Sequence, residues 1–153
     1  MMNYKNLITF VVCLVVIACN SNKNPYANNL GINPALAAQI DTAHYTLIKW
    51  QDTIINFGTI KEGDSVLLKY KFYNAGKTPL FVLQTRPACG CTVTDFPKDP
   101  IMPGKSGVIT GIFRSIYHPG NTYKTIQVVT NTRNKSSRLL VFKGMVEPSK
   151  KSN

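Results

Sequence analysis

Cys89 and Cys91 are the residues whose type and spacing could do chemistry, because a single glycine separates their two thiols. In an extended segment, side chains two residues apart point to the same face, and their Cα atoms lie about 6.6 Å apart. This separation is at the outer limit for a disulfide, but Gly90 lacks a Cβ and permits a tighter turn. The pattern leaves three alternatives: a short disulfide, a two-thiol metal clamp, or two buried structural thiols.

Other catalytic patterns are not found in the sequence. His44 and His118 fall in a polar segment and a His-Pro-Gly turn, and no Gly-x-Ser-x-Gly elbow, paired carboxylates or phosphate-binding glycine loop occurs. Structural zinc normally takes four Cys or His ligands. Copper(I) accepts soft sulfur ligands, so Cys89 and Cys91 could bind it with help from Met102. We expect no catalytic residue, no resident metal and no cofactor, with copper handling as an alternative.

The first 18 residues are typical of a bacterial lipoprotein signal peptide. Lys5 precedes an apolar run, residues 7–17, that is too short for a permanent membrane span. Val16-Ile17-Ala18-Cys19 resembles the lipobox of bacterial lipoproteins. By that resemblance Cys19 becomes the lipidated N-terminus, and its two or three acyl chains attach the protein stably to a membrane.

This processing would leave Cys89 and Cys91 unmodified, because Cys13 is removed with the signal and Cys19 carries lipid. An exported compartment permits disulfides, which favours oxidation of the remaining pair. Asn20 after Cys19 is compatible with outer-membrane sorting, by resemblance to lipoproteins in general. We therefore expect a lipid-anchored protein of the bacterial cell envelope, at the outer membrane and facing the periplasm.

Residues 19–46 are polar and rich in asparagine, which predicts a flexible tether between the lipid and a folded domain. Within this segment Asp41-Thr42-Ala43 resembles the Asp-Ser/Thr-aliphatic acceptor of a bacterial O-glycosylation system. Thr42 is therefore a candidate glycosylation site, and an ordinary turn is the alternative.

Residues 47–147 predict one all-β domain, because strand patterns alternate with turn residues throughout. The clearest strand spans 66–73, where apolar residues at every second position predict one buried face. Further strands are expected at 54–57, 80–84, 108–113, 123–130 and 140–146. Three prolines predict an irregular crossing between sheets at 96–104. The expected fold is an antiparallel sandwich of two sheets, with residues 148–153 as a basic tail.

The expected core of this sandwich consists of apolar residues on the inward faces of the strands. These residues are Phe57, Leu68, Tyr70, Phe72, Ile109, Phe113, Ile126, Val128 and Phe142.

A series of short motifs in this domain resembles the family known as domain of unknown function 1573. The motifs are Phe57-Gly58-x-Ile60, Phe72-x-Asn74-x-Gly76, Pro79-Leu80, Cys89-Gly90-Cys91-Thr92, Pro103-Gly104-x-x-Gly107, Asn131 and Leu140-x-Phe142-x-Gly144-x-Val146. Cys-Gly-Cys-Thr followed by Pro-Gly is the most specific part, although Ala88 stands where we expect Ser. The resemblance implies an immunoglobulin-like sandwich related to major-sperm-protein and Hydin-type domains, and it implies no established activity.

The chain is strongly basic, with a formal net charge of +11. Such a charge attracts anionic partners without requiring a motif, and the export signal argues against nucleic acid as the partner. We therefore expect a membrane-anchored, non-enzymatic envelope lipoprotein whose immunoglobulin-like domain binds a protein or an anionic envelope polymer. The alternative is a periplasmic thiol-redox or copper-handling protein that uses the Cys-Gly-Cys turn.

Overall fold

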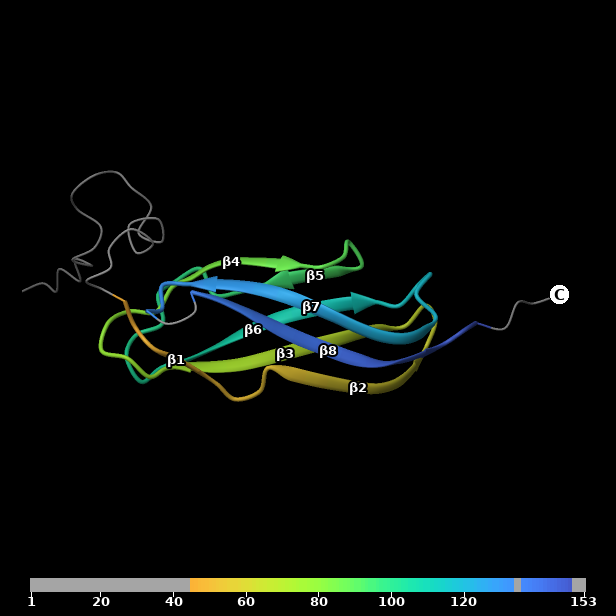
Figure 1. Ribbon diagram of the computed structural model, residues 1–153, viewed down its shortest axis with the longest axis horizontal. Helices are drawn as coiled ribbons and strands as arrows, with labels where there is room; N and C mark the ends of the chain where they lie inside the picture. The colour runs from red at the N-terminus through yellow and green to blue at the C-terminus, as the bar shows by residue number, and fades with distance from the viewer. Residues whose placement is uncertain (1–44, 134–135, 150–153) are drawn as a thin grey trace, which may run out of the picture. The chain divides into compact units, whose positions relative to one another are not determined.

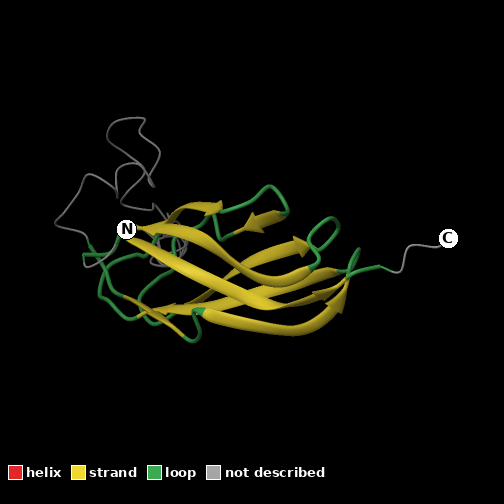
Figure 2. Ribbon diagram, turned by 45° about the vertical axis from the view of Figure 1, so that its right-hand side comes forward, coloured by secondary structure: helices red, strands yellow, loops and turns green. Residues whose placement is uncertain are grey.

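The computed structural model describes residues 45–133 and 136–149, which form eight strands. The strands are β1 (Ile48–Trp50), β2 (Ile54–Lys61), β3 (Ser65–Asn74), β4 (Val82–Pro87), β5 (Thr92–Asp95), β6 (Ser106–Arg114), β7 (Gly120–Thr130) and β8 (Ser137–Glu147). They form two four-stranded sheets, in the orders β1-β3-β6-β5 and β2-β8-β7-β4 (Figure 1). Figure 2 shows the loops gathered at the two ends of the strands. The predicted all-β sandwich of two sheets is confirmed.

The core lies between the inward faces of the two sheets. In β3 the alternation is regular: Leu68, Tyr70 and Phe72 are at most 2% exposed, while Lys69 and Lys71 are exposed. Burial of each such large apolar side chain contributes about 1.5–3 kcal/mol. All the expected core residues are buried except Phe57, which is half-buried and packs against the core. The core also includes Leu80, Val82, Leu140 and Val146.

Tyr70 links the two sheets by a hydrogen bond as well as by packing. Its hydroxyl donates to the backbone carbonyl of Val141 in β8, at 2.8 Å. Because the phenol is buried, ionisation would place a charge in a medium that solvates it poorly, and this raises the pKa of Tyr70 well above its usual value.

β2 differs from the prediction in both length and direction. The strand continues past Gly58 to Lys61, because Gly58 adopts a φ of 75° and a bulge between Asn56 and Thr59 absorbs the irregularity. β2 pairs with β8 in parallel, so the prediction of a wholly antiparallel sandwich is wrong at this edge. Five strands separate β2 from β8 along the chain, and therefore no short hairpin dictates an antiparallel direction.

The irregular crossing between sheets was also predicted in the wrong place. β5, which was not expected, pairs with β6 in the same sheet, so residues 96–105 connect two neighbouring strands of one sheet. Along this connection Ile101 forms an isolated bridge to Leu80. The chain changes sheet earlier, in the cysteine-containing turn between β4 and β5.

Several predicted boundaries move by a few residues. β4 spans Val82–Pro87 where 80–84 was expected, and β7 begins at Gly120 where 123 was expected. Thr46, assigned from the sequence to the tether, is 2% exposed and belongs to the packed domain. The predicted signal peptide, the lipidation site Cys19, the glycosylation site Thr42 and most of the basic tail lie outside the described residues.

Candidate functional site

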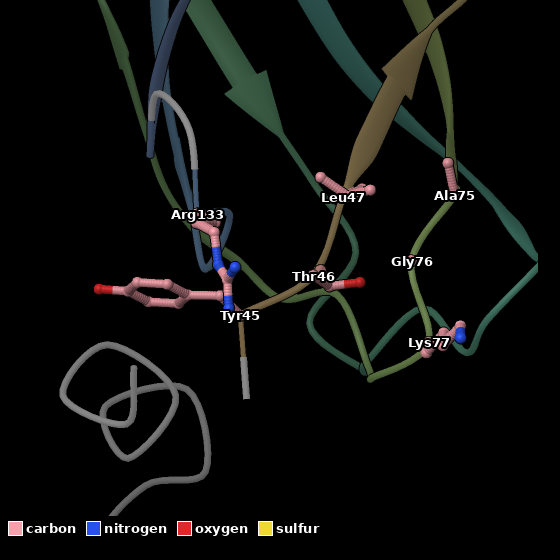
Figure 3. A pocket seen from close by; sticks show the side chains of 7 residues that line it. All are labelled: Tyr45, Thr46, Leu47, Ala75, Gly76, Lys77 and Arg133. Atoms are coloured by element: carbon pink, nitrogen blue, oxygen red, sulfur yellow. The ribbon is translucent and has the colours of Figure 1, made fainter. Parts of the chain in front are cut away.

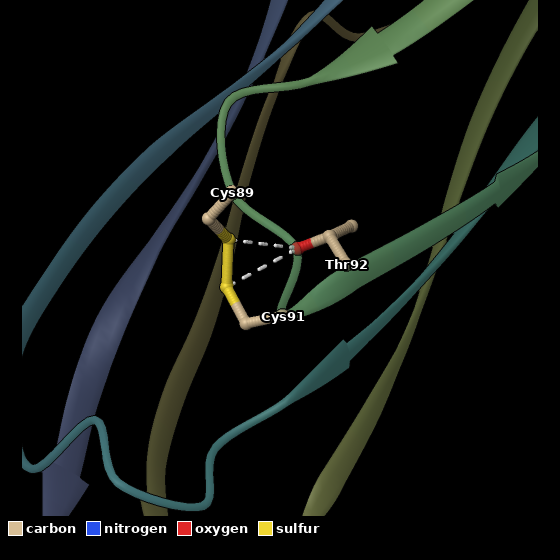
Figure 4. Close-up of a disulfide and its surroundings, with 3 residues drawn as sticks. All are labelled: Cys89, Cys91 and Thr92. Carbon is tan, nitrogen blue, oxygen red and sulfur yellow. Dashed lines mark hydrogen bonds between the residues drawn. A yellow bond between two sulfur atoms is a disulfide. The ribbon is translucent and has the colours of Figure 1, made fainter.

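Cys89 and Cys91 lie in the turn where the chain leaves one sheet and joins the other. The structure joins them in a disulfide, with Cα atoms 5.2 Å apart (Figure 4). This distance is shorter than the about 6.6 Å of an extended strand. Gly90, between them, is exposed and has no heavy atom within 4 Å of the position that a Cβ would occupy. Of the three alternatives left by the sequence, the structure contains the disulfide.

The neighbours of the cysteine turn hold it in place. The hydroxyl oxygen of the buried Thr92 lies 3.6 Å from the sulfur of Cys89 and 3.8 Å from that of Cys91 (Figure 4). Two backbone bonds tie the turn to other strands: the N–H of Ala88 donates to Thr125 O, and the N–H of Arg114 donates to Cys91 O, both at 2.9 Å. Ala88 therefore makes its bond through the backbone and needs no serine hydroxyl for it.

The predicted copper ligands do not come together. Cys91 lies beside Arg114 at the end of β6, whereas Met102 precedes the start of that strand. The length of β6, about 25 Å, therefore separates Met102 from the cysteines. Within the ranges 45–133 and 136–149, no three His, Cys, Asp or Glu residues cluster so as to hold a metal ion. The copper alternative, which needs Met102 beside Cys89 and Cys91, therefore does not fit this geometry.

A second candidate site lies at the end of the sandwich where the described chain begins. Four segments meet there, residues 45–47, 75–79, 101–105 and 131–133, and we call them the basic pole. They contain three exposed cations, Lys77, Lys105 and Arg133, and no Asp or Glu. Among the residues that the structure describes, none of these cations has an ion-pair partner.

Asn74 connects three segments of the basic pole from within. Its side chain is fully buried, and its oxygen accepts hydrogen bonds from the Thr46 hydroxyl at 2.8 Å and the Gly76 N–H at 3.0 Å. Its amide nitrogen donates to the carbonyls of Thr78 and Ile101, both at 2.8 Å. Both N–H groups and both lone pairs of the amide are thus used, so the buried polar group is fully satisfied.

Asn131 connects the fourth segment, residues 131–133, to its neighbours by hydrogen bonds. Its side-chain oxygen accepts from the Phe81 N–H at 2.8 Å, and its amide nitrogen donates to Pro79 O at 3.0 Å. Its backbone carbonyl accepts from the N–H of Thr46 at 3.2 Å. In the sequence analysis Asn131 and Asn74 appear only as parts of the family motifs. One signal was present for Asn74: it continues the every-second-residue series Leu68, Tyr70, Phe72 that faces inward.

A hollow of about 320 Å³ opens in the surface of the basic pole. Gly76 approaches Thr46 so closely that a Cβ there would overlap the threonine hydroxyl and lie 2.6 Å from the backbone nitrogen of Leu47. Figure 3 shows Tyr45 and Arg133 on one side of the hollow and Ala75, Gly76 and Lys77 on the other. Its lining residues are Tyr45, Thr46, Leu47, Ala75, Gly76, Lys77 and Arg133.

The opposite end of the sandwich carries charges of both signs, with a small excess of acidic residues. We call residues 61–64, 114–119 and 147–149 the acidic pole, because Glu62, Asp64 and Glu147 lie there beside Lys61 and Arg114. Hydrogen bonds tie its segments together: Glu62 N–H donates to Glu147 O at 2.8 Å and Ser115 N–H to Asp64 O at 3.0 Å. The strand β3 runs from this pole to the basic pole.

A third surface is the outer face of the sheet β1-β3-β6-β5. Val93, Ile112 and Leu67 lie in register on adjacent strands and form what we call the aliphatic row. Their side chains are 57%, 44% and 56% exposed. Leu67 alternates with the inward-facing residues of the strand predicted at 66–73, and no local pattern groups it with the other two.

Comparison with known proteins identifies a family and a fold. The sequence model of the family DUF1573, protein of unknown function, matches residues 48–146. A search of curated proteins gave no match. No helix in the described ranges has the length and apolar character needed to cross a membrane.

Similar solved structures have related sandwiches. A protein of unknown function from Porphyromonas gingivalis W83 has a TM-score of 0.59 and 14% identity over 68% of this chain and 48% of that one, so this chain spans about half of its length. PapD-like domain 7 of human CEP192, an ASH domain, has a TM-score of 0.52 and 11% identity over 69% and 89%. The VesB protease of Vibrio cholerae has 0.51 and 11% over 65% and 31%. At these identities the likeness shows only the fold, a PapD-like and immunoglobulin-like sandwich.

Proposed function

We propose that this chain, which belongs to the DUF1573 family of proteins of unknown function, is a membrane-anchored, non-enzymatic lipoprotein of the bacterial cell envelope. Its immunoglobulin-like domain binds an acidic protein through the outer face of the sheet β1-β3-β6-β5. The observation that carries the binding role is the aliphatic row. Lipid attachment at Cys19 is supported by the lipobox-like residues 16–19 and the polar segment behind them.

The aliphatic row has the character of a protein-binding surface. Single exposed apolar residues are common on any protein, whereas a contiguous apolar strip with a polar border is typical of an interface. Here three β-branched or aliphatic side chains lie directly opposite one another on β5, β6 and β3, each about half exposed. A partner that covers them removes this apolar area from water, which favours binding.

The charges around the row favour an acidic partner. Lys49, Lys69, Lys71 and Arg114 are exposed on the same face, and Asp95 is the acidic residue that accompanies them. A basic border steers an acidic partner toward the face and increases the association rate. A highly charged envelope polymer would satisfy the lysines but would leave the aliphatic row in water, so we favour a protein.

Site-specific photocrosslinking in native membranes tests this role. A photoreactive residue at Leu67 should give a discrete protein adduct, and the same residue at Leu139 should not. The two leucines are matched, at 56% and 55% exposed, but Leu139 lies on the other sheet. Adding Ile112→Lys should remove the adduct from position 67, because it places a charge within the row.

Two results would oppose the binding role. Equal adducts from positions 67 and 139 would mean random contact. An adduct from position 67 that resists protease would identify a polymer as the partner and replace the protein.

Membrane attachment has its own test. Cys19→Ala should move the protein from the membrane fraction to a soluble or unprocessed form, because the lipid supplies the attachment. An unchanged distribution and an unchanged N-terminal mass would exclude lipidation at Cys19.

A second candidate function is thiol–disulfide exchange at the cysteine turn. It is favoured by the position of the Thr92 hydroxyl, which lies near both sulfurs and could donate a hydrogen bond to a thiolate of the reduced pair. In such a reaction the dithiol would reduce a substrate disulfide to two thiols and itself become the Cys89–Cys91 disulfide. Either single change, Cys89→Ser or Cys91→Ser, should then abolish exchange with a disulfide substrate while stability stays nearly unchanged.

A further inference from the structure

We infer that the basic pole is a docking surface for anionic phospholipid headgroups, so that the domain rests against its membrane with this end toward the lipid. The inference extends the proposed membrane attachment at Cys19 by giving the domain an orientation. It concerns a surface distinct from the aliphatic row.

The position of the basic pole suits this role. Tyr45, the first described residue, lines the hollow of the basic pole, and residues 20–44 connect it to the proposed lipid at Cys19. Fully extended, those residues could span at most about 85 Å. A lipid at Cys19 would therefore keep the basic pole close to the membrane surface, and a tethered second contact forms at a high effective concentration. Even weak headgroup binding would then be significant.

The composition of the basic pole also suits a membrane surface. Lys77, Lys105 and Arg133 are exposed, and two apolar side chains beside them, Leu47 and Met102, are each 52% exposed. Cations with neighbouring apolar side chains are typical of segments that bind at the lipid–water interface. Three of the six acidic residues in the described ranges lie instead at the acidic pole. The charge distribution thus favours the basic pole as the end that faces an anionic surface.

The cations are carried on backbone that is already fixed. The N–H of Asn74 donates to Lys105 O, and the N–H of Gly104 donates to Asn74 O, both at 2.9 Å. The N–H of Ala75, two residues before Lys77, donates to Leu47 O at 2.8 Å. Because these segments need no ordering on binding, little conformational entropy is lost. The hollow between Lys77 and Arg133 leaves room for a phosphodiester, to which an arginine can donate two parallel hydrogen bonds (Figure 3).

Vesicle co-sedimentation of the unlipidated chain, residues 20–153, tests the inference independently of lipidation. All eight strands and the core lie within this chain, so it contains the complete sandwich. We expect binding to vesicles of phosphatidylglycerol and phosphatidylethanolamine in a 3:7 ratio. Vesicles of phosphatidylcholine and phosphatidylethanolamine should bind far less, and salt should weaken the anionic binding.

Two triple variants with the same net charge make the test specific. Lys77→Gln with Lys105→Gln and Arg133→Gln should weaken binding about 100-fold, since each cation near an anionic surface changes affinity about five-fold. The control, Lys61→Gln with Arg114→Gln and Lys143→Gln, removes two lysines and one arginine away from the basic pole. Its affinity should stay within about three-fold of the parent chain, because those charges are screened from the surface.

The apolar contribution has a separate variant. Leu47→Gln with Met102→Gln should weaken binding to the anionic vesicles while leaving its salt dependence unchanged. Thermal unfolding of each variant establishes that the fold is retained.

Three results would overturn the inference: no binding of the parent chain at low salt, equal binding to neutral vesicles, or equal loss in both triple variants. Equal loss would mean that only overall charge matters. None of these depends on the lipid, so they are distinguishable from a failure of the Cys19→Ala fractionation, which would remove the proposed anchor.

Discussion

The two poles of the sandwich are both held together by a buried polar side chain, but the chemistry differs. At the basic pole the Asn74 amide makes four hydrogen bonds, two as donor and two as acceptor. At the acidic pole the buried Ser115 hydroxyl faces two carbonyls, Lys61 O and Asp64 O, both at 2.9 Å. A hydroxyl has one proton, so it cannot donate fully to both. An amide can therefore join several segments where a hydroxyl cannot.

At the acidic pole, carboxylates also hold the backbone by accepting hydrogen bonds. Glu62 accepts hydrogen bonds from the N–H groups of Tyr117 and Ser149, both at 3.1 Å, and Asp64 accepts from the N–H of Lys61 at 2.9 Å. Its charged side chains thus hold backbone. At the basic pole the amides of Asn74 and Asn131 hold the backbone, and the cations have no such task. This difference is why we assign the basic pole, and not the acidic one, to binding.

The Asn74 amide and the Ser115 hydroxyl are two buried polar groups that join segments at the poles, and we call them the two hubs. Removing the Asn74 amide should have the largest effect. Asn74→Ala should destabilise the domain by about 4 kcal/mol, because it removes four hydrogen bonds that meet at a fully buried side chain, at about 1 kcal/mol each. Denaturant unfolding measures this. Asn56→Ala is the control, because Asn56 is exposed and its side chain accepts one bond, from the Gly58 N–H. A cost for Asn74→Ala no larger than that of Asn56→Ala would show that the amide does not hold the basic pole together.

Ser115→Ala tests the other hub and should cost less, about 2 kcal/mol. The two carbonyls share one side-chain donor and each also accepts from a backbone N–H, so the variant removes roughly one good hydrogen bond, from a fully buried hydroxyl. The backbone bond from Ser115 N–H to Asp64 O remains. If Ser115→Ala proves as costly as Asn74→Ala in the same unfolding experiment, the two hubs are equivalent and the comparison between them fails.

The covalent link near the acidic pole should contribute less than either hub. Cys89→Ser with Cys91→Ser should lower stability by about 1–2 kcal/mol, because a ring that encloses one residue removes little entropy from the unfolded chain. The domain should still fold. Loss of folding would mean that the disulfide is a major support. Loss of exchange activity without any stability change would favour the redox function instead.

The parts of the fold that were predictable are those that a local period determines. In β3, β6 and β8 the inward series repeats every second residue over a long strand, and the burial of Leu68, Ile109 and Phe142 follows from it. β5 has four residues directly after the cysteine turn, too few to show a period. The parallel pairing of β2 with β8 depends on contacts between distant segments, which a local pattern does not contain.

The candidate sites were predictable to different degrees. The cysteine turn was visible because two reactive residues are adjacent in the chain and Gly90 permits the bend. The basic pole was not visible, since it gathers four loops from separate parts of the chain around Asn74. Thr46 was assigned to the tether because the residues before it are polar, and nothing local indicates that its hydroxyl bonds to a residue 28 positions later. The aliphatic row likewise depends on the register of three strands.

Tyr70 lies in the sheet β1-β3-β6-β5 between the two poles. Its substitution shows how much one buried hydrogen bond outside the two hubs contributes to the free energy of unfolding. Tyr70→Phe keeps the ring packing and removes the hydroxyl that donates to Val141 O. At neutral pH it should cost about 1 kcal/mol in the free energy of unfolding, the usual value for one such bond and well below either hub.

The same residue should make stability depend on pH in alkaline solution. Burial raises the pKa of Tyr70 in the folded state, so above the unfolded pKa of about 10 the unfolded chain loses a proton that the folded domain keeps. Stability from this group is therefore complete below pH 10 and falls as pH rises, by about 1.4 kcal/mol per pH unit. Tyr70→Phe lacks this loss, so its deficit should shrink above pH 10 and vanish about one unit higher. Parallel unfolding curves of the two proteins from pH 8 to pH 11 measure the difference directly and cancel the titration of the lysines that they share. A deficit that stays constant across this range would mean that Tyr70 ionises equally easily in both states and that its burial is not as the structure has it.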